Sequence, residues 1–514
     1  MKDVFYMKDK KIVNPFSENS KILANKFDSA TIAKNTEELE LLINQALEII
    51  ENENVASQAQ IYYSIGTAYS DIAILTGISN DESLREKQLF YFRKSLSLIE
   101  SKELEKSEYR PYILGFKFNL YTNYANALKH LGRNIAAIEQ YKKVLDINPN
   151  FGMSLGNIGE AYQYYGLLVF DPAQRDYLHN CAYGMLSKAI RSNDPNMYSK
   201  AKEYFKHCIE QYDSEYVKKV LAIPLDIPQY DYPDSNELQY RKWALHNNLF
   251  LNPLNDLPYY EFCFAADVLH LPNMIVNINA KPIFHGMYNQ IKQEYIFARY
   301  QYYCGLQMPK EPHSADKDTY LLQFADYPQY SIRIEQLKCS FKTLYSLLDK
   351  VAFFINSYFE LGISERDVSF FSIWKTEKKG KTSYKYKNVL DPYSNFAISS
   401  LYWISKDFYK PFTVSPNPVA QRISKIRNAL EHKYVKVYWA IIPDRANGEI
   451  DDLALYVSED ELKAETLWLL KLIREIIICL SLAVNIEENK RRKNLEDKII
   501  PTFNFLNYDD EWKI

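Results

Sequence analysis

Residues 421–438 read QRISKIRNALEHKYVKVY, and this stretch decides how the C-terminal part of the chain is interpreted. An apolar residue recurs at intervals of three or four, which predicts an amphipathic helix with one buried face. The recurring residues are Ile423, Ile426, Leu430 and Tyr434. We therefore expect a surface helix whose polar side chains face outward.

The polar face of this helix carries Arg427, Asn428 and His432. A guanidinium is a permanent planar cation that binds phosphate, and an imidazole exchanges protons near neutral pH. On an ideal helix Asn428 and His432 share a face, whereas Arg427 lies about 140° from His432. A shared site thus needs the long arginine side chain or a second copy of the helix. The spacing alone is a weak signal, because Arg241 and His246 repeat it.

Three further helices are expected around this one, which makes residues 331–493 a four-helix bundle. The first begins near Ile334 with apolar residues at heptad-like spacing. The second spans about 394–410. The last begins at a capping box formed by Ser458 and Glu461.

Two shorter segments connect these helices. The runs KVYWAIIP and DLALYV flank the turn residues DRANGE at 444–449, which predicts a β-hairpin between the third and fourth helices. The lysine-rich segment 375–387, KTEKKGKTSYKYK, is expected to be a loop.

The N-terminal half is organised by repeats. From Phe118 to Pro149, large residues, a turn glycine, a small residue and a final proline follow one another at a spacing that resembles the tetratricopeptide repeat. A second unit starts near Leu155, and an insertion at 167–178 is expected to delay its second helix. An earlier unit lies around 62–99 and a degenerate one at 197–212. Helix pairs of this kind stack into a solenoid, and the resemblance implies a protein or peptide partner.

Length and composition divide the chain further. With 514 residues it is too long for one core. A net charge of −3 excludes a uniformly basic nucleic-acid coat protein, and 43 tyrosines against 14 glycines favour helices. The predicted parts are an irregular segment at 1–35, repeats at 36–222, a connecting subdomain at 223–330, the bundle at 331–493 and a tail at 494–514.

The same composition limits location and cofactors. Six scattered cysteines without a CxxC pair predict neither a disulfide framework nor a zinc finger, so a reducing cytoplasm is expected. The N-terminus has no apolar run of signal-peptide length. The most apolar stretch, 467–486, carries Lys471, Arg474 and Glu475, which indicates a buried helix, not a membrane span. No metal and no cofactor is predicted.

Arg427-Asn428, three residues and His432, on the third helix of a C-terminal four-helix unit, resemble the signature of the HEPN superfamily. Many members are metal-independent RNA endonucleases in which the motif helices of two protomers meet across a two-fold axis. The resemblance implies a homodimer through the bundle and an RNA substrate whose 2′-hydroxyl is the nucleophile. In that reaction His432 acts as general base or acid, Arg427 binds the scissile phosphate, and Asn428 orients the phosphate or the histidine.

Other residues are candidates for supporting roles. Asp349 and Glu431 are carboxylates that would position the histidine, with a surface or salt-bridging role as the alternative. Tyr434 completes a His-x-Tyr pattern that, in HEPN toxins, is nucleotidylated by a partner transferase; packing is the alternative. Basic side chains that would guide RNA, or would simply be solvated, are Lys378, Lys379, Lys381, Arg491 and Arg492.

The expected function is therefore an RNA endonuclease effector in a bacterial defence or toxin system, with the repeats as its sensor or regulatory arm. The alternative is a non-catalytic interaction protein that binds protein partners through the repeats and RNA or a nucleotide through the bundle. The expected fold class is mainly α: a helical-repeat solenoid followed by a HEPN-like four-helix bundle with a β-hairpin.

Overall fold

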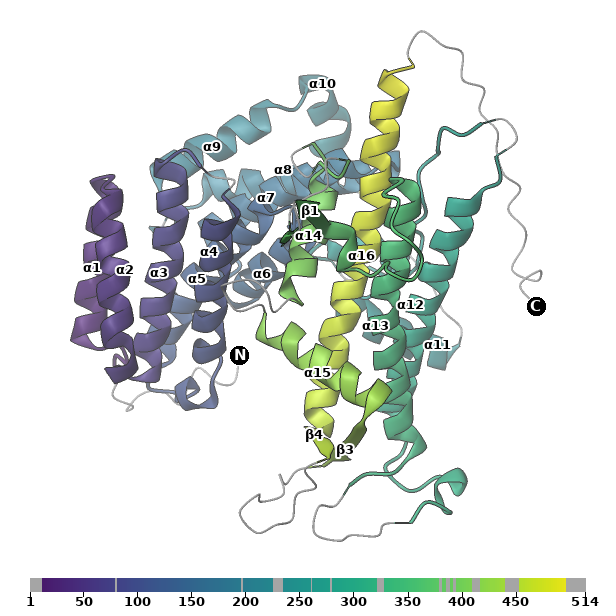
Figure 1. Ribbon diagram of the computed structural model, residues 1–514. Coiled ribbons are helices and arrows are strands. Elements are labelled where there is room, and N and C mark those ends of the chain that lie inside the picture. The colour runs from purple at the N-terminus through teal and green to yellow at the C-terminus, as the bar shows by residue number, and fades with distance from the viewer. Residues whose placement is uncertain are drawn as a thin grey trace.

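The computed structural model describes residues 12–495, with gaps at 79–80, 196, 225–233, 260, 278–279, 321–327, 379–380, 385–388, 392–393, 409–416 and 440–452. Within these residues the chain is mainly helical, with helical repeats on the N-terminal side and a helical bundle on the C-terminal side (Figure 1). The predicted fold class is confirmed in this respect. None of the described helices is both long enough and apolar enough to span a membrane.

The repeats are pairs of neighbouring helices, in which α3 packs on α4, α5 on α6 and α7 on α8. Small residues let the paired helices approach closely, as where the Phe92 ring of α4 covers Gly66 of α3. The helices of this part are α1 (Glu18–Ile32), α2 (Thr36–Ile49), α3 (Val55–Leu75), α4 (Glu82–Ile99), α5 (Arg110–His130), α6 (Asn134–Ile147), α7 (Gly152–Leu168), α8 (Pro172–Arg191), α9 (Ser199–Glu210) and α10 (Ser214–Tyr216).

Two expectations about the repeats are wrong. Residues 18–32 are not irregular but form α1, capped by Ser17 and buried through Leu23, Phe27 and Ala30, a short four-three spacing that the prediction overlooked. The insertion at 167–178 does not delay the second helix of its unit, because α8 already begins at Pro172. Asp171 accepts a hydrogen bond from the Gln174 N–H, so Asp-Pro here starts a helix.

The C-terminal bundle is built around α16, the longest helix. Two tyrosines of α12 reach its backbone, since the Tyr302 hydroxyl donates to the carbonyl of Lys463 and the Tyr288 hydroxyl to that of Ile477. The capping box of Ser458 and Glu461 is present as predicted. The helices are α11 (Ser235–His246), α12 (Ile283–Gln307), α13 (Ile332–Tyr358), α14 (Phe396–Asp407), α15 (Pro418–His432) and α16 (Glu459–Lys493).

The expected β-hairpin is wrong. Strands β3 (Tyr434–Tyr438) and β4 (Ala454–Ser458) pair in parallel, with Tyr434 opposite Ala454 and Tyr438 opposite Ser458. Parallel strands need a long return connection, and the fifteen residues between them far exceed a hairpin loop. The turn residues 444–449 lie outside the described residues. An antiparallel pair instead occurs where a lysine-rich loop was expected, between β1 (Lys375–Lys378) and β2 (Lys381–Tyr384).

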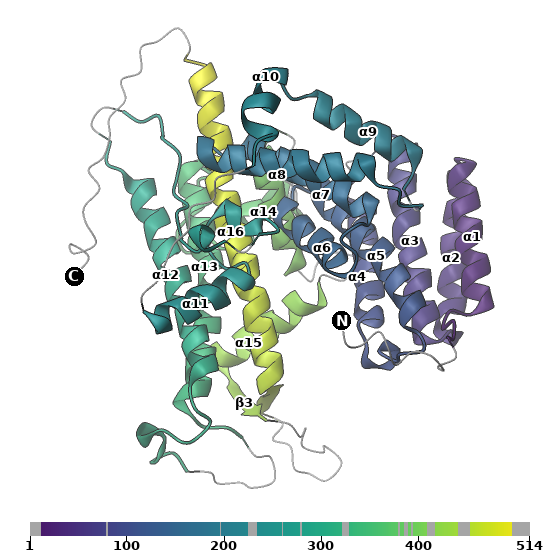
Figure 2. The ribbon, with the colours of Figure 1, turned by 180° about the vertical axis from the view of Figure 1, so that it is seen from behind.

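The repeats and the bundle meet through the turn between α5 and α6, which touches α14. Gly132 has a φ of 82°, and a Cβ on it would lie 2.3 Å from the Phe396 carbonyl oxygen, so only glycine fits. Beside it, the Ser399 hydroxyl donates to the Leu131 carbonyl at 3.0 Å. Figure 2 shows the same arrangement from behind, with α14 and α16 alongside α6 and α7.

Buried ion pairs complete this contact, which we call the junction. Arg133 binds both oxygens of Glu475 on α16, at 3.2 and 2.9 Å, and Asp407 at 3.0 Å. Arg93 of α4 also binds Asp407, at 2.7 Å. All four side chains are at most 11% exposed. The repeats and the bundle are therefore joined by charges that water hardly reaches.

Candidate active site on helix α15

Helix α15 forms because its start and its buried face are both encoded locally. Asn417 caps it by accepting from the Val419 N–H, and Pro418 occupies the first turn. Its inward face is fully buried at Ile423 and Ile426. The polar face with the candidate residues is left outside.

Tyr434 does not belong to the buried face of this helix. The helix ends at His432, and Tyr434 begins strand β3 with 39% of its surface exposed. Its hydroxyl lies 3.0 Å from that of Tyr330. The predicted three-four pattern therefore included one apolar residue too many, because Tyr434 fits the spacing by chance although it lies in the following strand.

Arg427, Asn428 and His432 lie on the outer side of α15, and the arginine is held in place. Its guanidinium carbon lies 5.3 Å from the centre of the Tyr345 ring of α13, and Nη1 donates to Asn428 Oδ1 at 3.1 Å. A cation over an aromatic ring keeps its charge while losing mobility. Burial raises the pKa of the Tyr345 phenol, so the ring stays a neutral support.

The His432 imidazole faces solvent. It is the last residue of α15, it is exposed, and no residue in the described ranges hydrogen-bonds to its ring. Both ring nitrogens are consequently open to a substrate or to a second protomer.

The two carboxylates considered as supports are engaged elsewhere. Asp349 accepts from the Phe370 N–H at 3.2 Å, and Glu431 lies 4.0 Å from Lys342 of α13. Neither hydrogen-bonds to His432. Asp349 therefore fixes the chain after α13, and Glu431 joins α15 to α13 at the surface.

The candidate RNA-guiding residues are not gathered at α15. Arg491 binds Glu488 at 2.7 Å, and Arg492 binds the Asn489 side chain at 2.9 Å. Both lie at the C-terminal end of α16, about 50 Å along that helix from the strands that follow His432 (Figure 1). The side chains of Lys378 and Lys381, and the whole of Lys379, lie outside the described residues.

The second arginine–histidine pair has its own bonds. Arg241 of α11 binds Glu237 at 2.7 Å and the Ala265 carbonyl, and His246 Nδ1 lies 2.7 Å from the Lys242 carbonyl oxygen. This pair serves the local structure of α11. Identical spacing therefore leads to different environments on α11 and α15.

Sequence reasoning missed an aromatic cluster next to the motif, formed by Tyr330, Tyr434, Lys436 and Tyr456. Lys436 Nζ lies 5.4 Å from the Tyr434 ring centre and 5.7 Å from that of Tyr456, which is in β4. Tyrosine rings can stack the bases of single-stranded RNA. The local signals were the His-x-Tyr pattern and Lys436 two residues after it, whereas Tyr330 and Tyr456 come from segments that are distant in sequence.

A buried carboxylate lies where α15 meets α16. Arg422 binds Glu461 at 2.6 Å and comes within 4.0 Å of Glu465. Glu465 Oε2 is buried without a hydrogen-bond partner among the described residues. Burial first, and the charge of Glu461 second, raise the pKa of Glu465 from 4.5 to about 7.

This shift predicts a pH-dependent stability. Between pH 4.5 and 7 the folded chain keeps a proton on Glu465 that the unfolded chain loses, so stability falls as pH rises through this window and levels off above it. We expect Glu465→Gln to raise the free energy of unfolding by about 1 kcal/mol at pH 8 and hardly at pH 5. Urea unfolding at both pH values measures this. The exposed Glu48→Gln should show no such difference, and equal behaviour of the two variants would refute the argument.

Comparison with known families agrees with this architecture. Residues 275–487 match the family model of the LA2681-like HEPN domain, and residues 118–151 match that of the tetratricopeptide repeat. No curated protein and no solved structure matches the chain. The chain thus contains a HEPN domain preceded by tetratricopeptide-like repeats, as the resemblance implied. The HEPN match includes α12, which packs along α13.

Proposed function

We propose that this chain, with its HEPN domain behind tetratricopeptide-like repeats, is an RNA endonuclease whose catalytic residues are Arg427, Asn428 and His432. The observation that carries the proposal is the outer face of α15: Arg427 is supported by Tyr345 while the imidazole of His432 stays open to solvent. A fixed cation can stabilise the charge on a reacting phosphodiester, and a free imidazole can transfer its protons.

In the proposed reaction RNA supplies its own nucleophile. His432 takes the proton of the 2′-hydroxyl, O2′ attacks the phosphorus, and the bond from phosphorus to O5′ breaks. The imidazolium returns its proton to the leaving 5′-oxygen. Arg427 binds the non-bridging oxygens and offsets the charge that develops on them, and Asn428 orients the phosphate. The products are a 2′,3′-cyclic phosphate and a 5′-hydroxyl, and no step uses a metal.

A second copy of the chain completes the site. Five residues apart on one helix, Arg427 and His432 point about 140° away from each other. A two-fold axis beside α15 would bring Arg427 of one protomer to His432 of the other. The proposal therefore includes a homodimer formed through the bundle.

The remaining parts are given roles by their position. The aromatic cluster around Tyr434 would stack the bases next to the scissile phosphate. The repeats would be the sensor or regulatory arm, which binds a protein or peptide partner, in a bacterial defence or toxin system. Their ion-paired junction with the bundle supports this role, since the ion pairs connect the repeats directly to α14 and α16.

A second candidate is RNA or nucleotide binding without cleavage. It is favoured by one observation: no residue in the described ranges orients the His432 ring. Catalytic histidines are commonly held by a partner. The two candidates differ in whether labelled RNA is cut.

The test is cleavage of 5′-labelled single-stranded RNA in EDTA, with the mass of the protein measured in parallel. We expect fragments that end in a 2′,3′-cyclic phosphate, produced by the dimer. An otherwise identical RNA with one 2′-deoxy residue should resist cleavage at that position only. Cleavage at the deoxy position would overturn the mechanism, and binding without any cut would favour the second candidate.

A further inference from the structure

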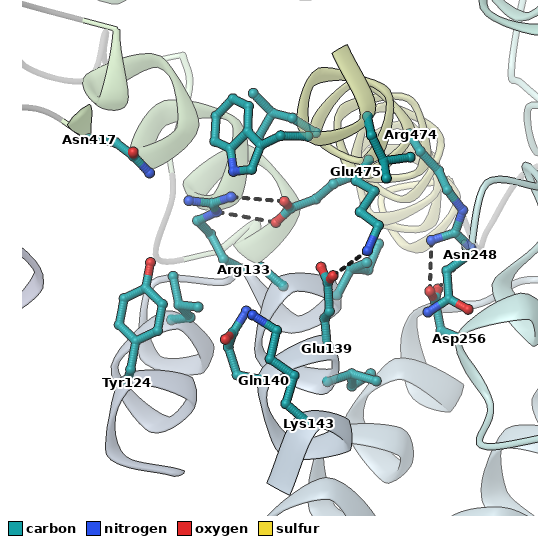
Figure 3. Close-up of a pocket in the computed structure, with 18 of the residues that line it drawn as sticks. Tyr124, Arg133, Glu139, Gln140, Lys143, Asn248, Asp256, Asn417, Arg474 and Glu475 are labelled. Carbon is teal, nitrogen blue, oxygen red and sulfur yellow. Dashed lines mark hydrogen bonds and ion pairs between the residues drawn. The ribbon is translucent and has the colours of Figure 1, made fainter. Parts of the chain in front are cut away.

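A cavity of about 350 Å³ lies inside the junction between the repeats and the bundle (Figure 3). Its walls come from α5 and α6 on one side and from α16 on the other, closed by Asn248 after α11 and by Asn417, the cap of α15. The volume is at the lower end of the range for small-molecule sites, about 300–1,000 Å³. It suits a ligand of mononucleotide size.

The charged walls of the cavity favour an anion. Four cationic and three anionic side chains line it, which leaves one positive charge in excess. Arg133 pairs with Glu475, Arg474 with Asp256, and Lys471 with Glu139 (Figure 3). The fourth cation, Lys143, is exposed and forms no ion pair with the described residues, and its Nζ lies 5.3 Å from the centre of the Tyr121 ring, which does not line the cavity.

Glu139 binds Lys471 at 2.6 Å and also lies near Lys143, without an ion pair to it. Burial alone would raise the pKa of Glu139, but Lys471 and Lys143 beside it hold that pKa below its ordinary value. The Lys471–Glu139 pair is also the more open of the pairs in the wall, with each side chain about one-third exposed, whereas Arg133 and Glu475 are nearly covered. An incoming phosphate must replace Glu139 at Lys471, and this exchange breaks a pair that solvent already reaches while the buried pairs stay intact.

The neutral part of the lining suits a flat heterocycle. Trp468, Leu467, Leu472 and Ile135 supply apolar surface, and an indole stacks well on a nucleobase. Three carboxamides, Gln140, Asn248 and Asn417, add hydrogen-bond donors and acceptors. The Asn248 side-chain oxygen is buried without a hydrogen-bond partner among the described residues, so a ligand group that donates a hydrogen bond can pair with it.

We propose that this cavity binds a mononucleotide, with its phosphate between Lys143 and Lys471 and its base against Trp468 and Gln140. The site touches the repeats and the bundle at once, and Asn417 both lines it and caps α15. Occupancy therefore stabilises one arrangement of the helix that carries Arg427 and His432. This goes beyond the proposed nuclease function and does not depend on it.

Isothermal titration of the full chain with AMP, GMP, CMP and UMP tests the proposal. We expect saturable binding of at least one of them, weakened about tenfold by Lys143→Ala and retained in Lys143→Arg. The matched control is Lys206→Ala, an exposed lysine on α9 outside the cavity, which should bind as the wild type does. Gln140→Ala should weaken binding separately, since it removes a contact to the base.

Three outcomes would refute the proposed nucleotide site. The proposal fails if none of the four nucleotides binds at millimolar concentration, or if Lys143→Ala binds them like wild type. It also fails if inorganic phosphate binds as tightly as the nucleotide, because the base would then add nothing. Because binding is measured without RNA, inactivity of the chain as a nuclease has no bearing on the result.

Discussion

His432→Ala is expected to reduce RNA cleavage by about 10²- to 10⁴-fold, the usual contribution of a positioned general acid or base. The fold should survive, because the side chain is exposed and no described residue hydrogen-bonds to it. Single-turnover cleavage of labelled RNA measures the loss, and the unfolding midpoint in urea checks the fold. Arg427→Ala should fall into the same range, with little recovery in Arg427→Lys, since an ammonium lacks the bidentate geometry.

The chain contains its own control for this experiment. His246 lies five residues after Arg241, as His432 lies five after Arg427, and it is also exposed at the end of a helix. His246→Ala should cleave RNA at the wild-type rate. If both histidine variants lose activity equally, or if neither does, α15 is not the site.

Mixing the two inactive variants tests whether the site is shared between protomers. In a mixed dimer of Arg427→Ala with His432→Ala, one of the two composite sites regains both residues. About a quarter of wild-type activity should then return after subunit exchange. No recovery, in a sample shown by mass to contain mixed dimers, would mean that each protomer uses its own arginine and histidine.

The largest loss of stability is expected from Arg133→Met, about 3–5 kcal/mol, the range for breaking a buried ion pair from one side. The substitution keeps the volume but leaves Glu475, which is 5% exposed, without its cation. Asp407 is less affected, because Arg93 still binds it. Urea unfolding followed by tryptophan fluorescence measures the change.

Restoring neutrality should recover much of that loss. Adding Glu475→Gln to Arg133→Met removes the stranded charge, so the double variant should be more stable than Arg133→Met alone. Arg191→Met, at the exposed end of α8, should change stability by less than about 0.5 kcal/mol. A double variant no more stable than the single one would show that the loss arises from packing instead of charge.

Local patterns in the sequence predicted most of the helices. The heptad spacing after Ile334 became α13, the Ser458–Glu461 capping box starts α16, and the unit from Phe118 became α5 and α6. Each depends on residues within a few turns of one another. The parallel pairing of β3 with β4 was not predictable in this way, because the direction of a strand depends on how its connection returns.

In the candidate site, too, the local pattern could be predicted and the long-range contacts could not. The spacing of Arg427 and His432 is local and was visible, but it was equally visible at Arg241. What separates the two pairs is Tyr345, 82 residues before Arg427, whose ring supports the guanidinium. The junction could not be predicted from local patterns, because Arg133 and Glu475 are 342 residues apart in sequence.

The glycine turn at the junction has a consequence for how such a chain can change in length. At Gly132 the turn between α5 and α6 packs against the Phe396 carbonyl of α14. Arg93 and Glu82 of α4 form ion pairs with Asp407 and Lys406 of α14. An extra repeat inserted between α4 and α8 would move α4 or the α5–α6 turn away from α14, and these contacts would be lost. Helices α1 and α2 instead share a separate core with α3. The array is therefore free to gain or lose repeats only at its N-terminal end.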